Sequence, residues 1–153
     1  MTRTPRFKKY SNSTTYNIEA KEQDYLYIKE SQIPGSGNGL FTAIAIYKDE
    51  VISVFKGEVL SGKEAQSRAS NGNNSYSIDL PDGTILDSMN VNCFAKYVND
   101  AMGSVKTTRK NNSKITLDED GKVCIVANRK ILVGEEIFCG YGNKYWLKDT
   151  IKK

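Results

Sequence analysis

The sequence predicts a mainly β fold with one or two short helices, and three observations support this class. Short runs of β-branched and aromatic residues recur along the chain, as half-buried strands require. Glycine-bearing turns separate these runs, and two of the turns contain the Asp-Gly pair that favours a hairpin. A clear helix start signal stands at Ser61. With 153 residues, the chain is long enough to form one domain with a substantial core.

The first part of the chain is predicted to be a polar arm followed by short strands. Residues 1–24 carry no clear period, which predicts an extended arm. Strand patterns cover residues 25–29, 40–44 and 50–57, and a glycine-rich loop over residues 33–41 leads into the second of them. This loop lacks the Gly-Lys-Ser/Thr ending of a triphosphate-binding loop. It is either only a turn or a place where main-chain groups approach a flat or charged ligand.

A short helix and two hairpins are predicted further along. Ser61 and Glu64 have the spacing of a capping box, so a helix is expected over residues 62–69. Hairpins are expected over residues 75–87 and 113–127, because each contains an Asp-Gly pair that supplies a positive φ. The remaining predicted elements are a short buried helical or irregular segment over residues 92–99 and a short apolar strand over residues 137–139.

Composition limits the chemistry that this chain can perform. Histidine is absent, which removes the usual general base, the Ser-His-Asp triad and the commonest zinc ligand. Cys93, Cys124 and Cys139 are widely spaced and form no Cys-x-x-Cys pair. This argues against a disulfide framework or a structural zinc site and favours a reducing compartment. Chemistry must therefore use tyrosine, carboxylates, thiols or the backbone.

Charge and hydropathy point to an intracellular protein. No run approaches the ~18 apolar residues of a membrane-spanning helix, and the first residues lack the hydrophobic stretch of a signal peptide. The net charge is +4, with basic residues gathered in the first ten positions and over residues 106–114. Such runs are usually solvated loops, so nucleic acid is not expected to be the primary partner. A small basic β-domain that touches nucleic acid stays an alternative.

Residues 134–146 (GEEIFCGYGNKYW) are the stretch around which the rest of the chain is expected to be organised. An acidic turn runs into a short apolar strand, after which Tyr141 stands between Gly140 and Gly142, with Trp146 close behind. Glycine has no Cβ, so backbone or ligand can approach the phenol closely. Taken alone, the stretch fits equally well the end of a strand followed by a core aromatic cluster.

Four separated segments resemble, in order, the motifs of the SET-domain protein lysine methyltransferases. They are residues 35–41 (GSGNGLF); residues 55–59 (FKGEV); the run from residues 76–79 (YSID) through Asp87 to residues 95–99 (AKYVN); and Asn112 followed by residues 134–142 (GEEIFCGYG). Each segment is weak alone, but their order and spacing together are specific.

The resemblance implies the SET fold and a domain division. The implied fold is β-clip-like, with small sheets around a C-terminal pseudoknot in which residues 134–142 thread past the loop that carries Asn99. The implied division is an N-terminal polar arm over residues 1–24, a SET domain over residues 25–146 and a tail over residues 147–153.

The resemblance also implies an activity. It is the transfer of a methyl group from S-adenosyl-L-methionine to a lysine ε-amine of a protein, with S-adenosyl-L-homocysteine as product and no metal. A histone tail is one candidate substrate. The implied location is nuclear if the source is eukaryotic or the protein acts on host chromatin, and otherwise cytoplasmic. Monomer and homodimer both stay open, and a catalytically inactive SET-like module that binds peptides or partners is the alternative function.

The residues that the resemblance assigns to the site fall into three groups. The catalytic pair is Tyr141, whose hydroxyl is placed at the transfer point, and Tyr76, which lines the lysine channel. The cofactor residues are Ser36, Gly37, Asn38, Lys96, Asn99, Asp100, Tyr141 and Trp146. The substrate channel is assigned to Tyr76, Ile115 and Cys139. Cys139 stands at a family position that limits the number of methyl groups, and its small side chain suggests room for more than one.

This chain departs from the family pattern at several of these positions. Asp100 stands where the family usually has histidine, which adds a negative charge near the cofactor. Lys96 replaces an arginine and has fewer donors. Gly140 replaces the aspartate before the catalytic tyrosine. In place of the zinc-bearing cysteine-rich tail of many relatives, Tyr145 and Trp146 are expected to close the cofactor site. These departures are what keep the inactive module open as an alternative.

Overall fold

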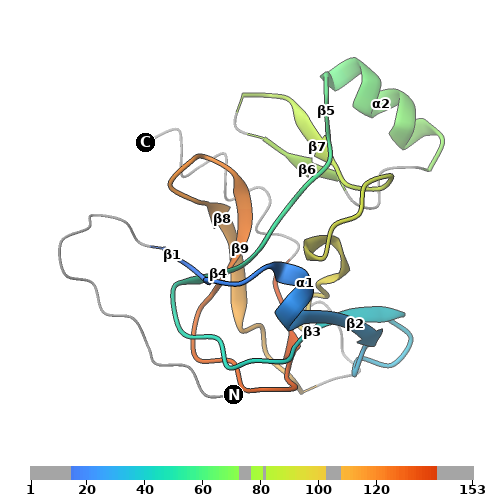
Figure 1. Ribbon diagram of the computed structural model, residues 1–153. Helices are drawn as coiled ribbons and strands as arrows, with labels where there is room; N and C mark the ends of the chain where they lie inside the picture. The colour runs from blue at the N-terminus through green and yellow to red at the C-terminus, as the bar shows by residue number, and fades with distance from the viewer. Residues whose placement is uncertain (1–14, 73–76, 81, 103–107, 141–153) are drawn as a thin grey trace.

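The computed structural model describes residues 15–72, 77–80, 82–102 and 108–140, which form three small sheets with a few short helices (Figure 1). The elements are β1 (Tyr16–Asn17), α1 (Glu22–Tyr25), β2 (Leu26–Glu30), β3 (Asn38–Thr42), β4 (Glu50–Val54), β5 (Glu58–Leu60), α2 (Gly62–Ser70), β6 (Ser77–Asp79), β7 (Ile85–Asp87), the 3₁₀ turn η1 (Ala95–Tyr97), β8 (Ser113–Leu117), β9 (Val123–Ala127) and β10 (Glu136–Ile137). The predicted mainly β class with short helices is confirmed.

The largest sheet has the strand order β1-β4-β9-β8. Its β8–β9 pair is the second predicted hairpin, with Ile115 opposite Ile125. The Asp-Gly turn between these strands has Gly121 at φ 78°, the left-handed conformation that favours glycine. β4 pairs antiparallel with β9, and β1 adds in parallel at the edge. All five residues of β9 are buried, as expected for the central strand of this sheet.

The two smaller sheets have the orders β10-β3-β2 and β5-β7-β6. β6 and β7 are the first predicted hairpin, and Gly83 in its turn has φ 89°. In Figure 1, β5, β6, β7 and α2 lie together at the upper right of the molecule, and β2 and β3 lie at the lower right. The strand predicted over residues 40–44 begins two residues earlier, at Asn38, because the whole of β3 pairs with β2.

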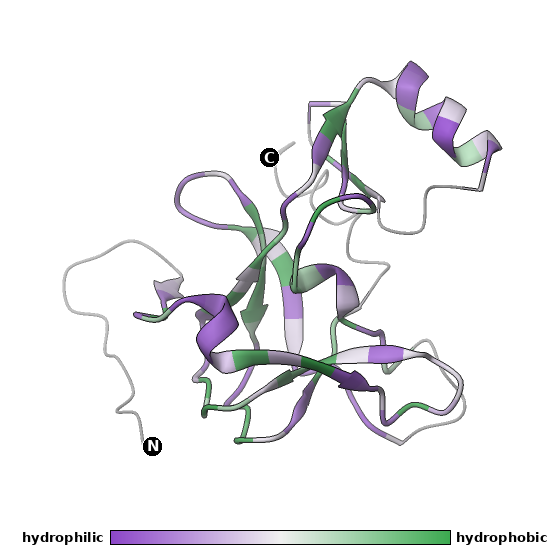
Figure 2. Cartoon of the chain, turned by 45° about the vertical axis from the view of Figure 1, so that its right-hand side comes forward, coloured by the Kyte–Doolittle hydropathy of each residue, from purple (hydrophilic) through white to green (hydrophobic). Residues whose placement is uncertain are grey.

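Helix α2 confirms the predicted capping box. The Glu64 N–H donates to Ser61 Oγ (3.2 Å), and the Ser61 N–H donates to Glu64 Oε1 (3.4 Å). None of its residues is buried, and Figure 2 shows hydrophilic residues over much of its length. Arg68 fastens the helix to the sheet by donating to Glu58 (3.0 Å) and to the buried Asp87 (2.8 Å). These two carboxylates raise the pKa of the Arg68 guanidinium.

The Ser61→Ala substitution is expected to destabilise α2 locally by about 1 kcal/mol, because the cap accepts an N–H that has no other partner in the helix. Hydrogen exchange of the α2 amides should therefore become about fivefold faster. The melting temperature should change little, since α2 buries no residue. Ser70→Ala, at the last helical position, is the matched control and should leave the exchange of the first turn unchanged. A large fall in melting temperature for Ser61→Ala would contradict this local role.

Residues 16–24 differ from the predicted extended arm, because hydrogen bonds join them to β4 and to the turn before it. The Tyr16 N–H donates to the Asp49 carbonyl (2.9 Å), and β1 pairs in parallel with β4. In α1, the Glu22 carboxylate accepts the Val54 N–H (3.1 Å) and also the hydroxyl of Ser53, both in β4. Tyr25 ends α1 and does not belong to the following strand. The domain division itself stays a prediction, since residues 1–14 and 147–153 lie outside the described residues.

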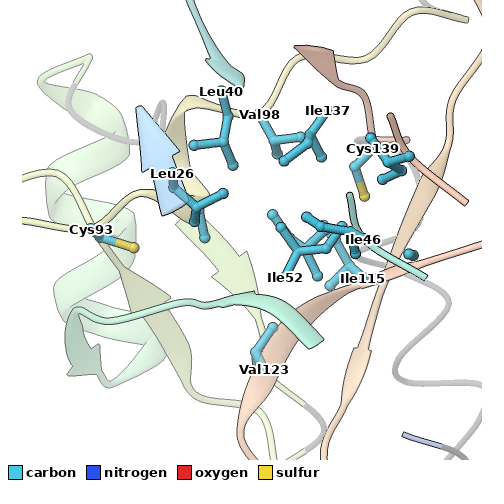
Figure 3. Close-up of a cluster of buried hydrophobic side chains, with 14 of the residues drawn as sticks. Leu26, Leu40, Ile46, Ile52, Cys93, Val98, Ile115, Val123, Ile137 and Cys139 are labelled. Atoms are coloured by element: carbon cyan, nitrogen blue, oxygen red, sulfur yellow. The ribbon is translucent and has the colours of Figure 1, made fainter. Parts of the chain in front are cut away.

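The main hydrophobic core joins strands from the different sheets (Figure 3). Its members come from all three sheets (β2, β3, β4, β6, β7, β8, β9 and β10), from α1, from the segments around η1, from the loop before β4 and from the residues on either side of β10. Those labelled in Figure 3 are Leu26, Leu40, Ile46, Ile52, Cys93, Val98, Ile115, Val123, Ile137 and Cys139. Full burial of such an aliphatic side chain contributes about 1.5–3 kcal/mol. The segments that carry the predicted site residues are therefore fixed to one another by a shared core.

Candidate functional site

The segment of residues 136–139 passes between two other parts of the chain. On one side, the Cys139 N–H donates to the Asn99 carbonyl (2.8 Å), and Asn99 and Phe138 form a parallel bridge. On the other side, the N–H groups of Asn112 and Ser113 both donate to the Phe138 carbonyl (3.1 Å each). This is the crossing that the family resemblance predicted, with the C-terminal segment running past the loop that carries Asn99.

Asn112 belongs to the fourth segment that resembles the family motifs. Its side chain binds residues 136–139, which we call the crossing segment. Its Oδ1 accepts the Phe138 N–H (2.9 Å), and its Nδ2 donates to the Glu136 carbonyl (3.0 Å). Only 1% of Asn112 is exposed. The carboxamide thus makes two hydrogen bonds to this short stretch of backbone that a neighbouring strand would otherwise make. A buried backbone donor or acceptor without a partner would be costly in free energy. Asn112 is a structural residue of the crossing.

Glu136 connects the crossing segment to Ser31 and Gln32, directly before the glycine-rich loop. Its carboxylate is buried, with 1% of the residue exposed. Oε1 accepts the Gln32 N–H (2.7 Å), and Oε2 accepts the Ser31 hydroxyl (2.7 Å) and the Asn99 amide (3.5 Å). The sequence prediction treated residues 134–136 as an acidic turn and missed this role. The available signal was a carboxylate placed directly before the apolar residues 137–139.

The glycine-rich loop and Asn99 lie next to each other. Asn99 Nδ2 donates to the Asn38 carbonyl (3.0 Å), and the Ser31 N–H donates to the Gly37 carbonyl (2.8 Å). Gly37 has φ 70°, and a Cβ there would meet nothing within 4 Å, so its requirement is conformational. Ser36, Gly37 and Asn38 are all exposed. The structure therefore brings together four predicted cofactor residues, with main-chain groups of the loop at the surface beside a carboxamide.

Gly39, which follows Asn38 in β3, is a position where other atoms approach too closely for a side chain. A Cβ built on Gly39 would stand 2.3 Å from Glu136 Oε2 and 3.3 Å from Asn99 Nδ2. Any larger residue would push the Glu136 carboxylate out of its hydrogen bonds. The loop, Glu136 and Asn99 are thus packed as one unit.

Lys96 and Asp100 bind other parts of the protein. Lys96 Nζ donates to the carbonyls of the turn before η1, at distances of 3.0 Å to Val91, 3.3 Å to Ser88 and 3.4 Å to Met89. Asp100 Oδ1 accepts the Met102 N–H (3.0 Å) and the side-chain amide of Asn111 (3.0 Å). Both residues are near Asn99 in the sequence, and their assignment to the cofactor stays a prediction.

Ile115 and Cys139, assigned to the substrate channel, lie in the main core. Their exposed fractions are 3% and 0%, and Figure 3 shows both near Ile46 and Ile137. Burial raises the pKa of the Cys139 thiol to about 12, although Ser113 hydrogen-bonds to it. The thiol is therefore neutral near pH 7 and is not a nucleophile. The channel assignment stays a prediction.

The remaining predicted site residues, Tyr76, Tyr141 and Trp146, lie outside the described residues, as does Tyr145. Their assignments stay predictions too. Gly140, which departs from the family residue beside the predicted catalytic position, is the last described residue before Tyr141.

A pocket of about 690 Å³ lies apart from these residues, between α1, the end of β4 and the segment before η1. It is lined by Ala20, Lys21, Glu22, Gln23, Ile28, Val54, Lys56, Asn92, Cys93, Phe94 and Tyr97. Of the predicted site residues within the described part of the chain, none lines it. Over the same ranges, no three or more His, Cys, Asp or Glu side chains gather as a metal site would need. The helices described there are too short or too polar to cross a bilayer.

Small sheets around a threaded C-terminal segment, with a glycine-rich loop beside Asn99, define the SET class of fold. The SET domain family model matches residues 37–142, more than half of the chain, so the chain belongs to the SET-domain family. The fold and the family resemblance predicted from the sequence are thereby confirmed.

Two relatives show how distant the similarity is. A maize (Zea mays) protein described as histone-lysine N-methyltransferase EZ1 is 29% identical over 124 residues, which are 79% of this chain and 13% of the maize protein. A chain of a solved apo ctPRC2 structure with a mutated Ezh2 is 26% identical with a TM-score of 0.65, covering 78% of this chain and 15% of that one. This chain therefore spans only a small part of the length of these relatives.

Proposed function

We propose that this chain is an S-adenosyl-L-methionine-dependent protein-lysine N-methyltransferase. The observation that carries the proposal is the contact of Asn99 Nδ2 with the Asn38 carbonyl, which sets a carboxamide against the exposed glycine-rich loop. The crossing segment, in which the Cys139 N–H donates to the Asn99 carbonyl, leads directly into Tyr141 in the sequence. Exposed main-chain groups, a carboxamide and glycine positions fit a nucleoside with polar edges, and membership of the SET family supports the same cofactor.

Methyl transfer of this kind needs no histidine. When bound, S-adenosyl-L-methionine supplies a methyl group on a sulfonium, and the methyl–sulfur bond breaks as the bond to the lysine nitrogen forms. A free lysine has a pKa of about 10.4, so its amine must lose a proton before it can attack. An apolar channel lowers that pKa, and so does a nearby positive charge. Water can then take the proton, and the protein supplies alignment, which contributes several kcal/mol.

Each predicted site residue has a role in this proposal. Main-chain groups of residues 36–38 and the Asn99 carboxamide hold the nucleoside, and Trp146 packs on its adenine. Tyr141 orients the amine at the transfer point, and Tyr76 lines the lysine channel with Ile115 and Cys139. Lys96 and Asp100 border the cofactor beside Asn99.

The substrate class is a protein with an exposed lysine. Because the maize relative is described as a histone-lysine N-methyltransferase, a histone tail is the first substrate to test. The proposed location is nuclear if the source is eukaryotic or the protein acts on host chromatin, and cytoplasmic otherwise. The protein works as a monomer or a homodimer.

The second candidate function is a SET-like module that binds peptides or partners without transferring a methyl group. Asp100, Lys96 and Gly140 favour it, because all three depart from the residues that the family has beside the cofactor and the catalytic tyrosine. Such a module keeps the fold and loses the transfer.

Calorimetry with S-adenosylhomocysteine tests cofactor binding, and a labelled-methyl assay against histones and a peptide array tests transfer. Mass spectrometry of the products gives the modified lysine and the number of methyl groups. We expect binding in the micromolar range. No binding at that level would overturn the proposed function.

The Tyr141→Phe substitution is expected to lower the rate of methyl transfer at least about tenfold, because it removes the hydroxyl that orients the amine. Affinity for S-adenosylhomocysteine should stay within about threefold of the original value. Tyr27→Phe, at an exposed tyrosine of β2 that stacks on Phe41, is the matched control and should change neither quantity. Transfer by Tyr141→Phe at the unchanged rate would show that Tyr141 does not have this role.

A further inference from the structure

The side chains of Asp100 and Asn111 fasten the two ends of the segment between them. Asp100 Oδ1 accepts the Asn111 amide (3.0 Å), and Asn111 Oδ1 accepts the Ala101 N–H (2.9 Å). The same Asp100 oxygen also accepts the Met102 N–H (3.0 Å). We call this arrangement the clasp: the side chains of Asp100 and Asn111 with the N–H groups of Ala101 and Met102.

The clasp stands beside the crossing. Asn99, directly before it, accepts the Cys139 N–H with its carbonyl, and Asn112, directly after it, binds the same segment from the other side. The two residues that grip the segment of residues 136–139 are therefore each covalently joined to one half of the clasp. Fixing the distance between Asp100 and Asn111 fixes the gap through which that segment runs.

The clasp also determines where the Asn99 side chain stands. Asn99 is held through its carbonyl by Cys139, and its carboxamide reaches the Asn38 carbonyl (3.0 Å) and Glu136 Oε2 (3.5 Å). Both distances depend on the path of the backbone at residues 99–101. That path is the part of the chain that the clasp holds by the Ala101 N–H.

The carboxylate of Asp100 suits the clasp better than the histidine usual in the family. One carboxylate oxygen has two lone pairs and accepts both the Met102 N–H and the Asn111 amide. A neutral histidine has a single acceptor nitrogen and can make one of these two bonds. Asp100 and Asn111 therefore form a matched pair.

We propose that Asn111, acting through Asp100 and Ala101, is a positioning residue that sets the Asn99 carboxamide for the cofactor. This inference rests on the proposed function. It assigns a role to Asn111, which the sequence motifs did not include, and it makes the residue at position 100 dependent on the residue at position 111.

A charge exchange across the clasp tests the inference. Asn111→Asp sets a second carboxylate against Asp100 and removes the amide donor, so affinity for S-adenosylhomocysteine should fall about tenfold. In the double variant Asp100→Asn with Asn111→Asp, the amide and the carboxylate change places. The amide at position 100 then donates to the carboxylate at position 111, which still accepts the Ala101 N–H, but that amide nitrogen cannot accept the Met102 N–H, so this one hydrogen bond of the clasp is lost. Affinity should therefore recover to within about threefold of the unsubstituted chain.

Affinity is measured by calorimetry well below the melting temperature, which is recorded for each variant without ligand. Asn17→Asp, on the exposed edge strand β1, makes the same change of charge elsewhere and should leave affinity unchanged. A lower melting temperature with unchanged affinity in Asn111→Asp would show a merely structural clasp and overturn the inference. Failure of the double variant to restore affinity would overturn it as well.

The outcomes also separate this inference from the proposed function. An unsubstituted chain that binds no S-adenosylhomocysteine overturns the proposed function. Binding by the unsubstituted chain with equal affinity in Asn111→Asp overturns only the positioning role. Should Asn111→Asp fail to fold, the double variant decides: folding with near-original affinity supports the inference, and tenfold weaker binding or failure to fold overturns it.

Discussion

Replacing Glu136 by alanine is expected to lower the free energy of unfolding by about 3 kcal/mol. The buried carboxylate accepts the Ser31 hydroxyl and the Gln32 N–H at 2.7 Å each, and it contacts the Asn99 amide. Alanine leaves these donors without their acceptor, and it empties the space that lies against Gly39. Both effects are destabilising, since buried donors without partners and residual cavities each cost free energy. Equilibrium unfolding in urea measures the loss.

Glu135→Ala is the matched control for this prediction, because it makes the same change at the neighbouring position. The Glu135 side chain is 26% exposed, accepts the Leu132 N–H (2.9 Å) and pairs with Arg129 (3.3 Å). Water and salt screen such a partly exposed ion pair, so we expect a loss below about 1 kcal/mol. Equal losses for the two variants would contradict the importance of the buried network.

A further consequence separates the two glutamates. Glu136 joins Gln32, directly before the glycine-rich loop, to Asn99, and the loop and Asn99 hold the cofactor in the proposed function. Glu136→Ala should therefore weaken S-adenosylhomocysteine binding under conditions in which the variant is still folded. Glu135→Ala should not, since its partners lie in the turn before β10.

The parts of the fold that the sequence predicts well are those decided by neighbouring residues. The two Asp-Gly pairs supply the positive φ at Gly83 and Gly121 that each hairpin turn needs. The helix after Ser61 follows from two side chains and two N–H groups, those of Ser61 and Glu64, within four residues. In all these places the chemistry that selects the structure is visible within a short window of sequence.

The parts that the sequence does not predict depend on partners far along the chain. Glu136 binds residues 104 and 105 positions away, and Glu22 fixes α1 by binding β4, 32 positions away. No local pattern marks such partners, so the sequence predicted residues 16–24 as part of an extended arm and residues 134–136 as an acidic turn. The early start of β3 has the same origin, because Gly39 has low strand preference by itself but is required where Glu136 approaches.

For the candidate site, the order of the motifs predicted which segments meet, whereas the individual contacts needed the structure. The glycine-rich loop, Asn99 and the crossing segment are brought together as the family resemblance implied. The same resemblance did not indicate that Lys96 binds backbone carbonyls or that Asp100 has Asn111 as a partner. These contacts arise at positions where this chain departs from the family, and a family pattern carries no information about them.

Gly57→Ala is expected to destabilise the protein by about 3 kcal/mol, because a side chain at this position would strike backbone atoms. A Cβ built on Gly57 stands 2.3 Å from the Asp87 carbonyl oxygen and 2.6 Å from its carbon. Asp87 cannot move aside easily, since it is opposite Glu58 in the β5–β7 ladder. Its neighbour Ser88 also donates a hydroxyl hydrogen bond (2.5 Å) to the carbonyl of the residue before Gly57. Relief of the clash therefore requires β5 to separate from β7.

Gly62→Ala is the control, because a Cβ on Gly62 meets nothing within 4 Å and lies at the first position of α2. Alanine favours a helix more than glycine does, so Gly62→Ala should leave stability unchanged or raise it by less than about 1 kcal/mol. Thermal unfolding of the two variants should thus show a large fall in melting temperature for Gly57→Ala and none for Gly62→Ala. If Gly57→Ala melts at the original temperature, β5 and β7 do not approach as closely as the structure has them. Gly57 lies within residues 55–59, the second segment that resembles the family motifs. The result therefore also tests whether backbone packing requires glycine at this motif position.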